Sequence, residues 1–139
     1  MRSRVPIVIT DRLHLNAAYV GWWNPKILVA RDATKILSEE DLRALISHEE
    51  AHRNCFHVEI NFLLSAIIFY AVITALVASP FWGVVEAAIL SVLMRLVRLM
   101  QEAEADAYAD PECMERVILM LSRRLGFEER YRLRILRAR

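Results

Sequence analysis

Cysteine, glycine and proline are scarce in this chain of 139 residues, which contains two cysteines, three glycines and four prolines. Two cysteines are too few for a disulfide framework and fit a reducing compartment. The N-terminal segment lacks a small-residue cleavage site, so it does not resemble a secretory signal. We therefore expect a chain that is not exported.

Charge is also absent from one long segment. Apolar residues make up 56% of the chain and charged residues 25%, yet no charged residue occurs from 60 to 85. The length is that of one domain. The net charge is only +1, but seven arginines follow Met120. No nucleic-acid-binding fold signature accompanies this basic end, so we expect no nucleic-acid partner. Its segment "ERYRLRILRAR" either lies against anionic lipid or solvates a helix end.

The hydrophobic pattern predicts an α+β fold that is mainly helical. Residues 5–10, 13–20 and 26–30 are short runs rich in β-branched and aromatic residues, which favour a small antiparallel sheet. Ser38, followed by Asp41, has the pattern of a helix N-cap, so a helix should begin at about Glu39. Neither glycine nor proline interrupts it before Pro80. A second helix is expected over 83–109, and a third from the Asp110-Pro111 pair to about Gly126.

The first of these helices contains the segment Ser-His-Glu-Glu-Ala-His at 47–52. His48 and His52 are four residues apart, so they project from one helical face and are close enough to share a metal ion. Glu49 lies beside them, where a carboxylate takes a proton from a metal-activated water. The alternative is an ordinary polar helix face, and this short pattern alone does not decide between the two.

A zinc site needs a third protein ligand. The metzincin arrangement is excluded because Cys55 and Val58 occupy the positions of its glycine and third histidine. Glu59 lies about 10 Å too far along the helix axis. The remaining option is a carboxylate from a separate helix, and the segment at 101–110 supplies Glu102 with Asp106 on the same face. A complete site uses one carboxylate as a ligand and a second to orient a histidine.

The two motifs, His48-Glu49-x-x-His52 and Glu102-x-x-Ala105-Asp106, resemble those of gluzincin metallopeptidases of the HtpX and CAAX prenyl protease type and their small relatives, the minigluzincins. The likeness covers about residues 5–125. It implies zinc bound by His48, His52 and Glu102, Glu49 as general base, and Asp106 as a partner of a ligand histidine. The resemblance also implies that a peptide substrate lies as an added strand along Asn16 and Ala17.

The chain departs from this family pattern in three ways. Ala51 stands where the family usually has glycine, and Gln101 where arginine is common. The N-terminal transmembrane helices of the HtpX type are absent. The resemblance is therefore to a reduced version of the family.

The long uncharged segment predicts a helical hairpin over residues 60–100. His52 and Glu102 are far apart in sequence, so the chain must travel out and return for both to reach one ion. Residues 60–79 form about 30 Å of helix, the thickness of a bilayer's hydrocarbon core, and Phe81 and Trp82 at the turn suit its interface. Arg53, Arg95 and Arg98 lie on the side of the site, which favours a two-helix membrane protein with a cytoplasmic active site. The alternative is a buried helix pair in a cytoplasmic soluble homo-oligomer.

Other residues have less specific interpretations. Tyr108 is one candidate donor to a developing oxyanion, but the sequence does not identify that donor. His57 lies off the face of His48 and His52 and is interpreted as a satisfied or surface histidine, and Glu104 as solvated or paired. Cys55 lies on the histidine face and is interpreted as a small buried thiol.

These interpretations lead to one expected function and one alternative. We expect a single metallopeptidase domain over 1–139, with a sheet and motif helix at 1–59, the hairpin at 60–100, and the second motif, a C-terminal helix and the basic tail at 101–139. Its activity would be zinc-dependent hydrolysis of peptide bonds in a peptide or protein substrate. The alternative is a membrane hairpin or oligomeric binding module whose metal site is structural, latent or degenerate.

Overall fold

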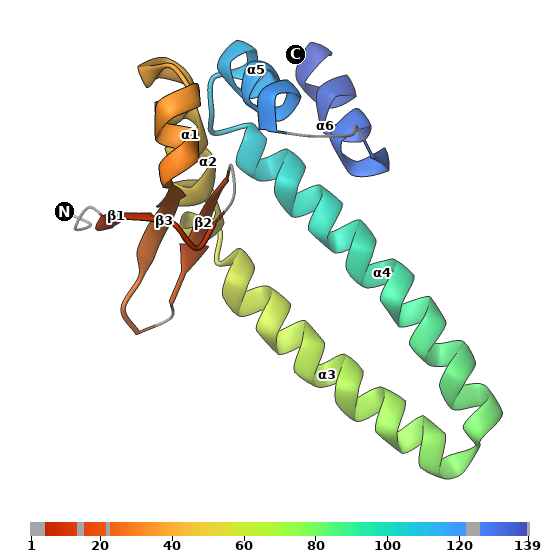
Figure 1. Cartoon of the computed structure of the whole chain (residues 1–139). Coiled ribbons are helices and arrows are strands. Elements are labelled where there is room, and N and C mark those ends of the chain that lie inside the picture. The colour runs from red at the N-terminus through yellow and green to blue at the C-terminus, as the bar shows by residue number, and fades with distance from the viewer. Residues whose placement is uncertain (1–4, 14–15, 22, 122–125, 139) are drawn as a thin grey trace.

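A computed structural model gives the arrangement of the chain and describes residues 5–13, 16–21, 23–121 and 126–138. A small sheet and four shorter helices lie at one end, and two long helices extend away from them (Figure 1). The predicted α+β, mainly helical fold class is confirmed. The elements in chain order are β1 (Ile7–Thr10), β2 (Ala17–Val20), β3 (Lys26–Ala30), α1 (Arg31–Ile36), α2 (Glu39–Asn54), α3 (His57–Ala78), α4 (Pro80–Asp106), α5 (Pro111–Leu121) and α6 (Phe127–Arg137).

The sheet is mixed rather than purely antiparallel. Its strand order is β1-β3-β2, with β3 antiparallel to β2 as predicted but parallel to β1. β3 lies at the centre of the sheet, where Ile27, Val29 and Ala30 are almost fully buried. The second predicted strand is shorter than expected, since β2 begins at Ala17, and residues 14–15 lie outside the described part. In the order β1-β3-β2, β2 is an edge strand.

The start of α2 agrees with the sequence. Ser38 is the N-cap, and its hydroxyl oxygen accepts a hydrogen bond from the amide of Asp41 at 3.2 Å. The Asp41 side chain also accepts from Arg116 of α5 at 3.0 Å, which ties this end of α2 to a later helix. One face of α2 is buried and includes Leu45, His48 and Glu49. The cap therefore fixes where the histidine motif begins.

The helix predicted to continue from α2 is interrupted before α3, at a place where the sequence contains neither glycine nor proline. α2 ends at Asn54, and Phe56 adopts a left-handed conformation with φ of 56° before α3 begins at His57. A residue with a Cβ pays about 1–2 kcal/mol to adopt this conformation. Contacts formed beyond the break must offset that cost, and the sequence pattern did not predict it.

The helices α3 and α4 form the predicted hairpin (Figure 1). Only Ser79 separates them, so α4 starts at Pro80, slightly before the predicted Gly83. A Cβ atom at Gly83 would lie 2.8 Å from the Cα of Leu76, which shows that the helices approach closely here because this position is glycine. α4 then continues without interruption to Asp106, so the returning arm also carries the second motif.

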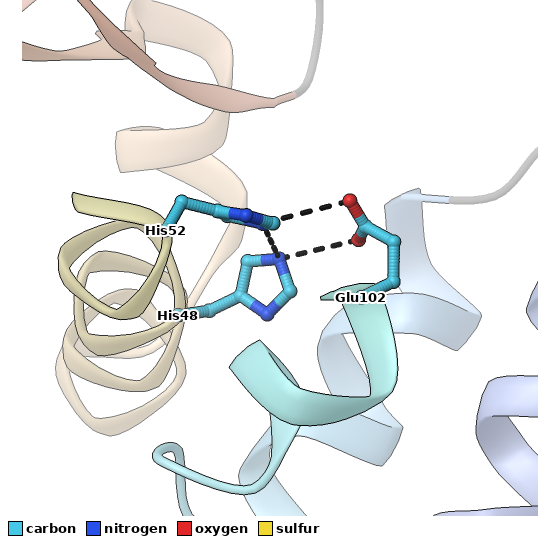
Figure 2. A group of neighbouring side chains, drawn as sticks. All are labelled: His48, His52 and Glu102. Atoms are coloured by element: carbon cyan, nitrogen blue, oxygen red, sulfur yellow. Dashed lines mark hydrogen bonds and ion pairs between the residues drawn. The ribbon is translucent and has the colours of Figure 1, made fainter. Parts of the chain in front are cut away.

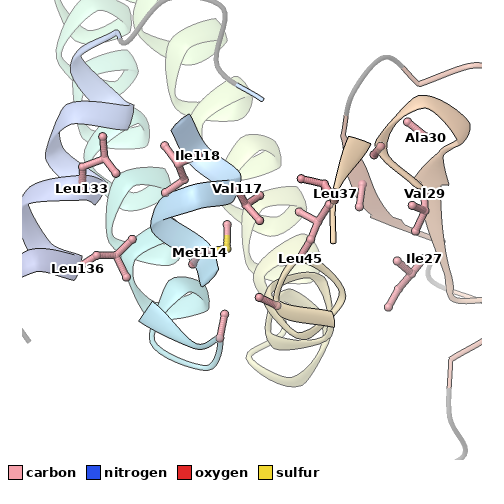
Figure 3. Packing of buried hydrophobic residues seen from close by; sticks show 14 of the residues in the cluster. Ile27, Val29, Ala30, Leu37, Leu45, Met114, Val117, Ile118, Leu133 and Leu136 are labelled. Carbon is pink, nitrogen blue, oxygen red and sulfur yellow. The ribbon is translucent and has the colours of Figure 1, made fainter. Parts of the chain in front are cut away.

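The hydrophobic core connects the sheet to the C-terminal helices. Figure 3 shows side chains of β3, α2, α5 and α6 in one cluster, with Leu45 and Val117 near its middle. The predicted third helix is α5, which ends at Leu121, whereas its expected end near Gly126 follows residues 122–125, outside the described part. α6 was not predicted as a helix, yet Leu133 and Leu136 are buried in this core. The core thus holds α6 beside α4 and α5.

Candidate metal centre

The two motifs meet between α2 and the end of α4. His48 and His52 lie one turn apart on α2, and their Nε2 atoms are 3.1 Å apart. The Glu102 carboxylate faces both rings from α4, with Oε2 3.4 Å from His48 Nε2 and Oε1 3.5 Å from His52 Nε2. Figure 2 shows this convergence of three side chains from two helices. It joins residues that are remote in the sequence.

The spacing of these donor atoms fits a tetrahedral metal ion. Zinc–nitrogen and zinc–oxygen bonds of about 2.0–2.2 Å at tetrahedral angles place neighbouring ligand atoms about 3.3 Å apart. The separation of 3.1 Å between the two Nε2 atoms is close to this value, and each Nε2 atom has one oxygen of the Glu102 carboxylate at 3.4 or 3.5 Å. Two imidazoles and one carboxylate are also a typical donor set for zinc. Within the described residues, this group contributes three side chains, so a tetrahedral ion keeps one position for water or substrate.

The charge around the donor atoms also favours a divalent cation. Glu49, Glu102 and Asp106 all lie within the site, and Arg132 from α6 contacts Glu102 and Asp106. Arg132 Nη1 lies 2.9 Å from Glu102 Oε2, and its Nε and Nη2 donate to the two oxygens of Asp106 at 2.7 and 2.6 Å. Three carboxylates and one guanidinium leave an excess of negative charge, which favours protonation of His48 when no metal ion is bound. A divalent cation would neutralise the same excess.

The two carboxylates held by Arg132 remain ionised despite their burial. Burial by itself raises the pKa of Glu102, but its contact with His48 and the charge of Arg132 outweigh this and lower the pKa. The pKa of Asp106 is lowered for the same reasons, with His48 and Arg132 opposing the effect of burial. Both groups are therefore negative at neutral pH and available to a cation.

The two histidines differ in their electrostatic surroundings. Burial lowers the pKa of His48, but the carboxylates of Asp106 and Glu102 dominate and raise the pKa to about 9. His48 Nδ1 lies 2.9 Å from Asp106 Oδ1, although at an angle outside that of a regular hydrogen bond. The pKa of His52 is lowered to about 4, chiefly by burial. The site thus attracts positive charge at His48 and keeps His52 neutral.

Glu49 occupies the position expected of a general base. It follows His48 on α2 and is 8% exposed, and burial raises the pKa of its carboxyl group. Its Oε2 accepts a hydrogen bond from the amide of Tyr19 on β2 at 2.8 Å. A more basic carboxylate is a better proton acceptor at neutral pH. The edge strand and the potential base are therefore in direct contact.

A cavity of about 840 Å³ lies over the cluster. Asn16, Ala17 and Tyr19 line one of its walls, together with the three residues of the donor group. Ala30 of β3 donates to the carbonyl of Asn16, so by the alternation of an antiparallel pair the backbone groups of Ala17 and Tyr19 point away from β3. The amide of Ala17 donates locally, to Asn16 Oδ1 at 2.9 Å. The edge strand thus presents backbone groups to the cavity.

Two contributors to the site were not identified from the sequence. Arg132 lies in the segment interpreted as lipid-facing or solvating; the amphipathic spacing of Leu133 and Leu136, with acidic residues first and basic residues last, would have indicated a packed helix. His57 is satisfied, as one interpretation had it, but it contacts His52, because the break before α3 turns it back toward α2. No helical periodicity reveals such a contact.

Tyr108 and Cys55 lie apart from the donor atoms of the centre. Tyr108 is 59% exposed, and its hydroxyl lies 3.7 Å from the sulfur of Cys55. Neither side chain lines the cavity as described. The structure therefore brings together His48, Glu49, His52, Glu102 and Asp106, with Asn16 and Ala17 at the rim, and places Tyr108 elsewhere.

Comparison with known proteins gives one match. Residues 2–125 match the sequence model of peptidase family M48, whereas no curated protein and no solved structure matches the chain. The match includes both motifs and ends before α6, which carries Arg132. Since most of the chain is covered and the donor residues of the two motifs converge, the chain belongs to peptidase family M48, a family of metal-dependent proteases.

Proposed function

We propose that this chain is a zinc-dependent endopeptidase in which His48, His52 and Glu102 hold the metal. The observation that carries the proposal is the convergence of these donor atoms at separations suited to one tetrahedral ion, with Glu49 beside them. The gluzincin resemblance of both motifs supports the same assignment. The proposal treats residues 1–139 as one metallopeptidase domain.

The residues divide the chemistry between binding and proton transfer. When bound, zinc supplies a Lewis acid that activates water and polarises a carbonyl group. Glu49 accepts a proton from the attacking water and delivers it to the leaving amine. Its burial, which raises the carboxyl pKa, suits both steps. Asp106 and Arg132 hold His48 and Glu102 in place while this occurs.

The edge strand β2 is the proposed binding place for a peptide substrate. An extended peptide would donate to the backbone carbonyl groups of Ala17 and Tyr19, because the amides of these residues already donate to Asn16 Oδ1 and Glu49 Oε2. Such pairing is independent of side chains, so it orients many sequences equally well. The backbone of the substrate would then cross the site next to Glu49, whose carboxylate already contacts the amide of Tyr19.

Metal dependence provides the direct test of this function. The purified wild-type protein should contain about one zinc ion per chain and should cleave an unstructured protein substrate such as casein. A chelator should abolish cleavage, and added zinc should restore it. A protein that binds zinc but cleaves nothing over a broad set of peptides would support the structural-site alternative, and absence of zinc binding would contradict the proposal.

We also propose that the hairpin of α3 and α4 crosses a lipid bilayer. α3 has 22 residues, about 33 Å of helix, and is the one helix in the described part that is long and apolar enough to span a membrane. None of its most apolar window is buried, unlike the core helix of a soluble protein. Phe69, Val77 and Phe81 are each at least 69% exposed, so large apolar side chains of both helices face outward in the described structure. A bilayer covers such a surface on all sides.

Arginine placement supports a cytoplasmic site. Arg53, Arg95 and Arg98 lie toward the site end of the hairpin, whereas the turn at Ser79 carries no basic residue. α4 is less apolar than α3 because it carries Glu86 near the turn and two arginines near the other end, where long side chains reach the interface.

Cysteine labelling tests the membrane arrangement. In Ser79→Cys, a membrane-impermeant thiol reagent applied to intact spheroplasts should label the turn, whereas the native Cys113 should react only after permeabilisation. The wild type, which lacks the added thiol, is the matched control. Extraction of the protein by alkaline carbonate, followed by a defined oligomer without detergent, would instead support the soluble oligomer.

A further inference from the structure

A second histidine pair lies beside the metal centre. His57 Nδ1 lies 2.8 Å from His52 Nδ1, on the side of the His52 ring opposite the donor group. The other nitrogen of His57, Nε2, lies 3.2 Å from Oε2 of Glu104. His57 is 2% exposed, whereas the side chain of Glu104 is 54% exposed. The contacts form a chain from His52 on α2, through the first turn of α3, to α4.

The break between α2 and α3 makes this chain of contacts. In a continuous helix, residues five apart point about 140° away from each other, and their rings would not meet. The left-handed conformation of Phe56 reverses the direction instead, and brings the two ring centroids within 4.9 Å. The contact between His52 and His57 is a gain that offsets the strain at Phe56.

The positions of the hydrogen atoms determine which residue donates in each of these hydrogen bonds. Glu104 is a carboxylate and accepts, so in a neutral His57 it is Nε2 that carries the hydrogen, and Nδ1 has a free lone pair. The hydrogen between the two Nδ1 atoms then belongs to His52. A neutral His52 protonated at Nδ1 has a bare Nε2, and this is the atom that faces His48 and Glu102. The contacts of His57 and Glu104 thereby favour the tautomer of His52 that can bind a metal ion.

We propose that His57 and Glu104 are positioning residues that hold His52 in the ring orientation and tautomer needed to bind the metal ion. The inference rests on the proposed metal site. Each ligand histidine would then have its own supporting residues. Asp106 contacts His48, and the pair of His57 and Glu104 supports His52. Both supporting carboxylates come from α4, which also provides Glu102.

A competing use of the same residues is a second metal site. Cys55, His57 and Glu104 place ligand atoms within 4.8 Å of one another. A metal on His57 Nε2 would move its hydrogen to Nδ1, so His52 Nδ1 would have to accept and its Nε2 would become protonated. The 2.8 Å contact between the rings therefore makes the two metal sites mutually exclusive. The support of His52 is compatible with the main donor group, and a second ion is not.

Zinc affinity of full-length variants in detergent tests the proposal, with a chromogenic chelator as competitor. We expect His57→Leu to bind zinc about 10- to 100-fold more weakly than wild type, the usual effect of losing a partner of a ligand histidine. His57→Asn should recover most of the affinity, because the amide oxygen can take the place of Nδ1 and accept from His52. Glu104→Ala should weaken binding in the same direction, and Glu40→Ala, an exposed change on α2, should not.

The outcomes separate this inference from the proposed function. Wild type binding one zinc, with His57→Leu and Glu104→Ala both within about twofold of it, would overturn the positioning role and leave the peptidase proposal standing. Two zinc ions in wild type and one in His57→Leu would show the second metal site instead. Failure of wild type to bind zinc would overturn both. If His57→Leu does not fold, Glu104→Ala decides the question, because this side chain is 54% exposed and its truncation leaves no buried cavity.

Discussion

Replacement of Glu49 by glutamine should abolish peptide hydrolysis while leaving zinc in place. The amide keeps the shape of the side chain but does not accept a proton, and loss of a general base lowers rates by about 10²- to 10⁴-fold. Burial raises the pKa of this carboxyl group. Burial also keeps bases in the solvent from taking its place beside the donor group. The measurement is kcat on a fluorogenic peptide, with metal content determined on the same preparation.

Glu50 provides the matched control for this experiment. It is the neighbouring glutamate on α2, and it does not line the cavity as described. Glu50→Gln should therefore retain wild-type activity. If Glu49→Gln cleaves at more than half the wild-type rate in a preparation free of other proteases, Glu49 is not the base.

Replacement of Glu102 by alanine should remove the metal itself. Glu102 is the α4 carboxylate that faces the Nε2 atoms of both histidines, whereas Asp106 contacts Nδ1 of His48 on the other side of that ring. Two imidazoles alone hold zinc weakly. Loss of partners outside the ligand set already costs 10- to 100-fold in metal affinity, so loss of a ligand should cost more than about 100-fold. The affinity is measured by chelator competition, and peptide hydrolysis should be lost in parallel.

The folded state of this variant needs its own control because Arg132 loses one of its two carboxylates. Glu102→Gln keeps a hydrogen-bond acceptor for Arg132 but is a poor zinc ligand, so it should fold as wild type does and still lack metal. Circular dichroism in detergent gives the comparison. Wild-type zinc affinity in both variants would assign the third ligand to another residue.

The position of the candidate site was predictable because helical periodicity relates nearby residues. Four-residue spacing placed His48 and His52 on one face, and the cap at Ser38 fixed where their helix begins. The pairing of Glu102 with these histidines needed more than periodicity; it came from excluding other ligands and from a family resemblance. The structure then supplied the distances between the ring nitrogens and the Glu102 carboxylate.

The features that the sequence did not reveal depend on competition between distant parts of the chain. The sheet is mixed because buried β3 inserts between β1 and β2, whereas local pattern favours pairing of neighbours in sequence. Phe56 breaks the helix without a glycine or proline, since tertiary contacts of His57 outweigh local preference. In the sequence, Arg132 does not differ from the other arginines of the basic end. The packing of α6 beside α4 places its guanidinium against Asp106.

The place of Arg132 in the chain affects the order in which the centre is completed during synthesis. The ribosome produces the histidines and both motif carboxylates well before α6 emerges. Until then Glu102 and Asp106 stand close together without the guanidinium that bridges them. Once α6 has been synthesised and packs beside α4, the charge of Arg132 lowers the repulsion between these two carboxylates.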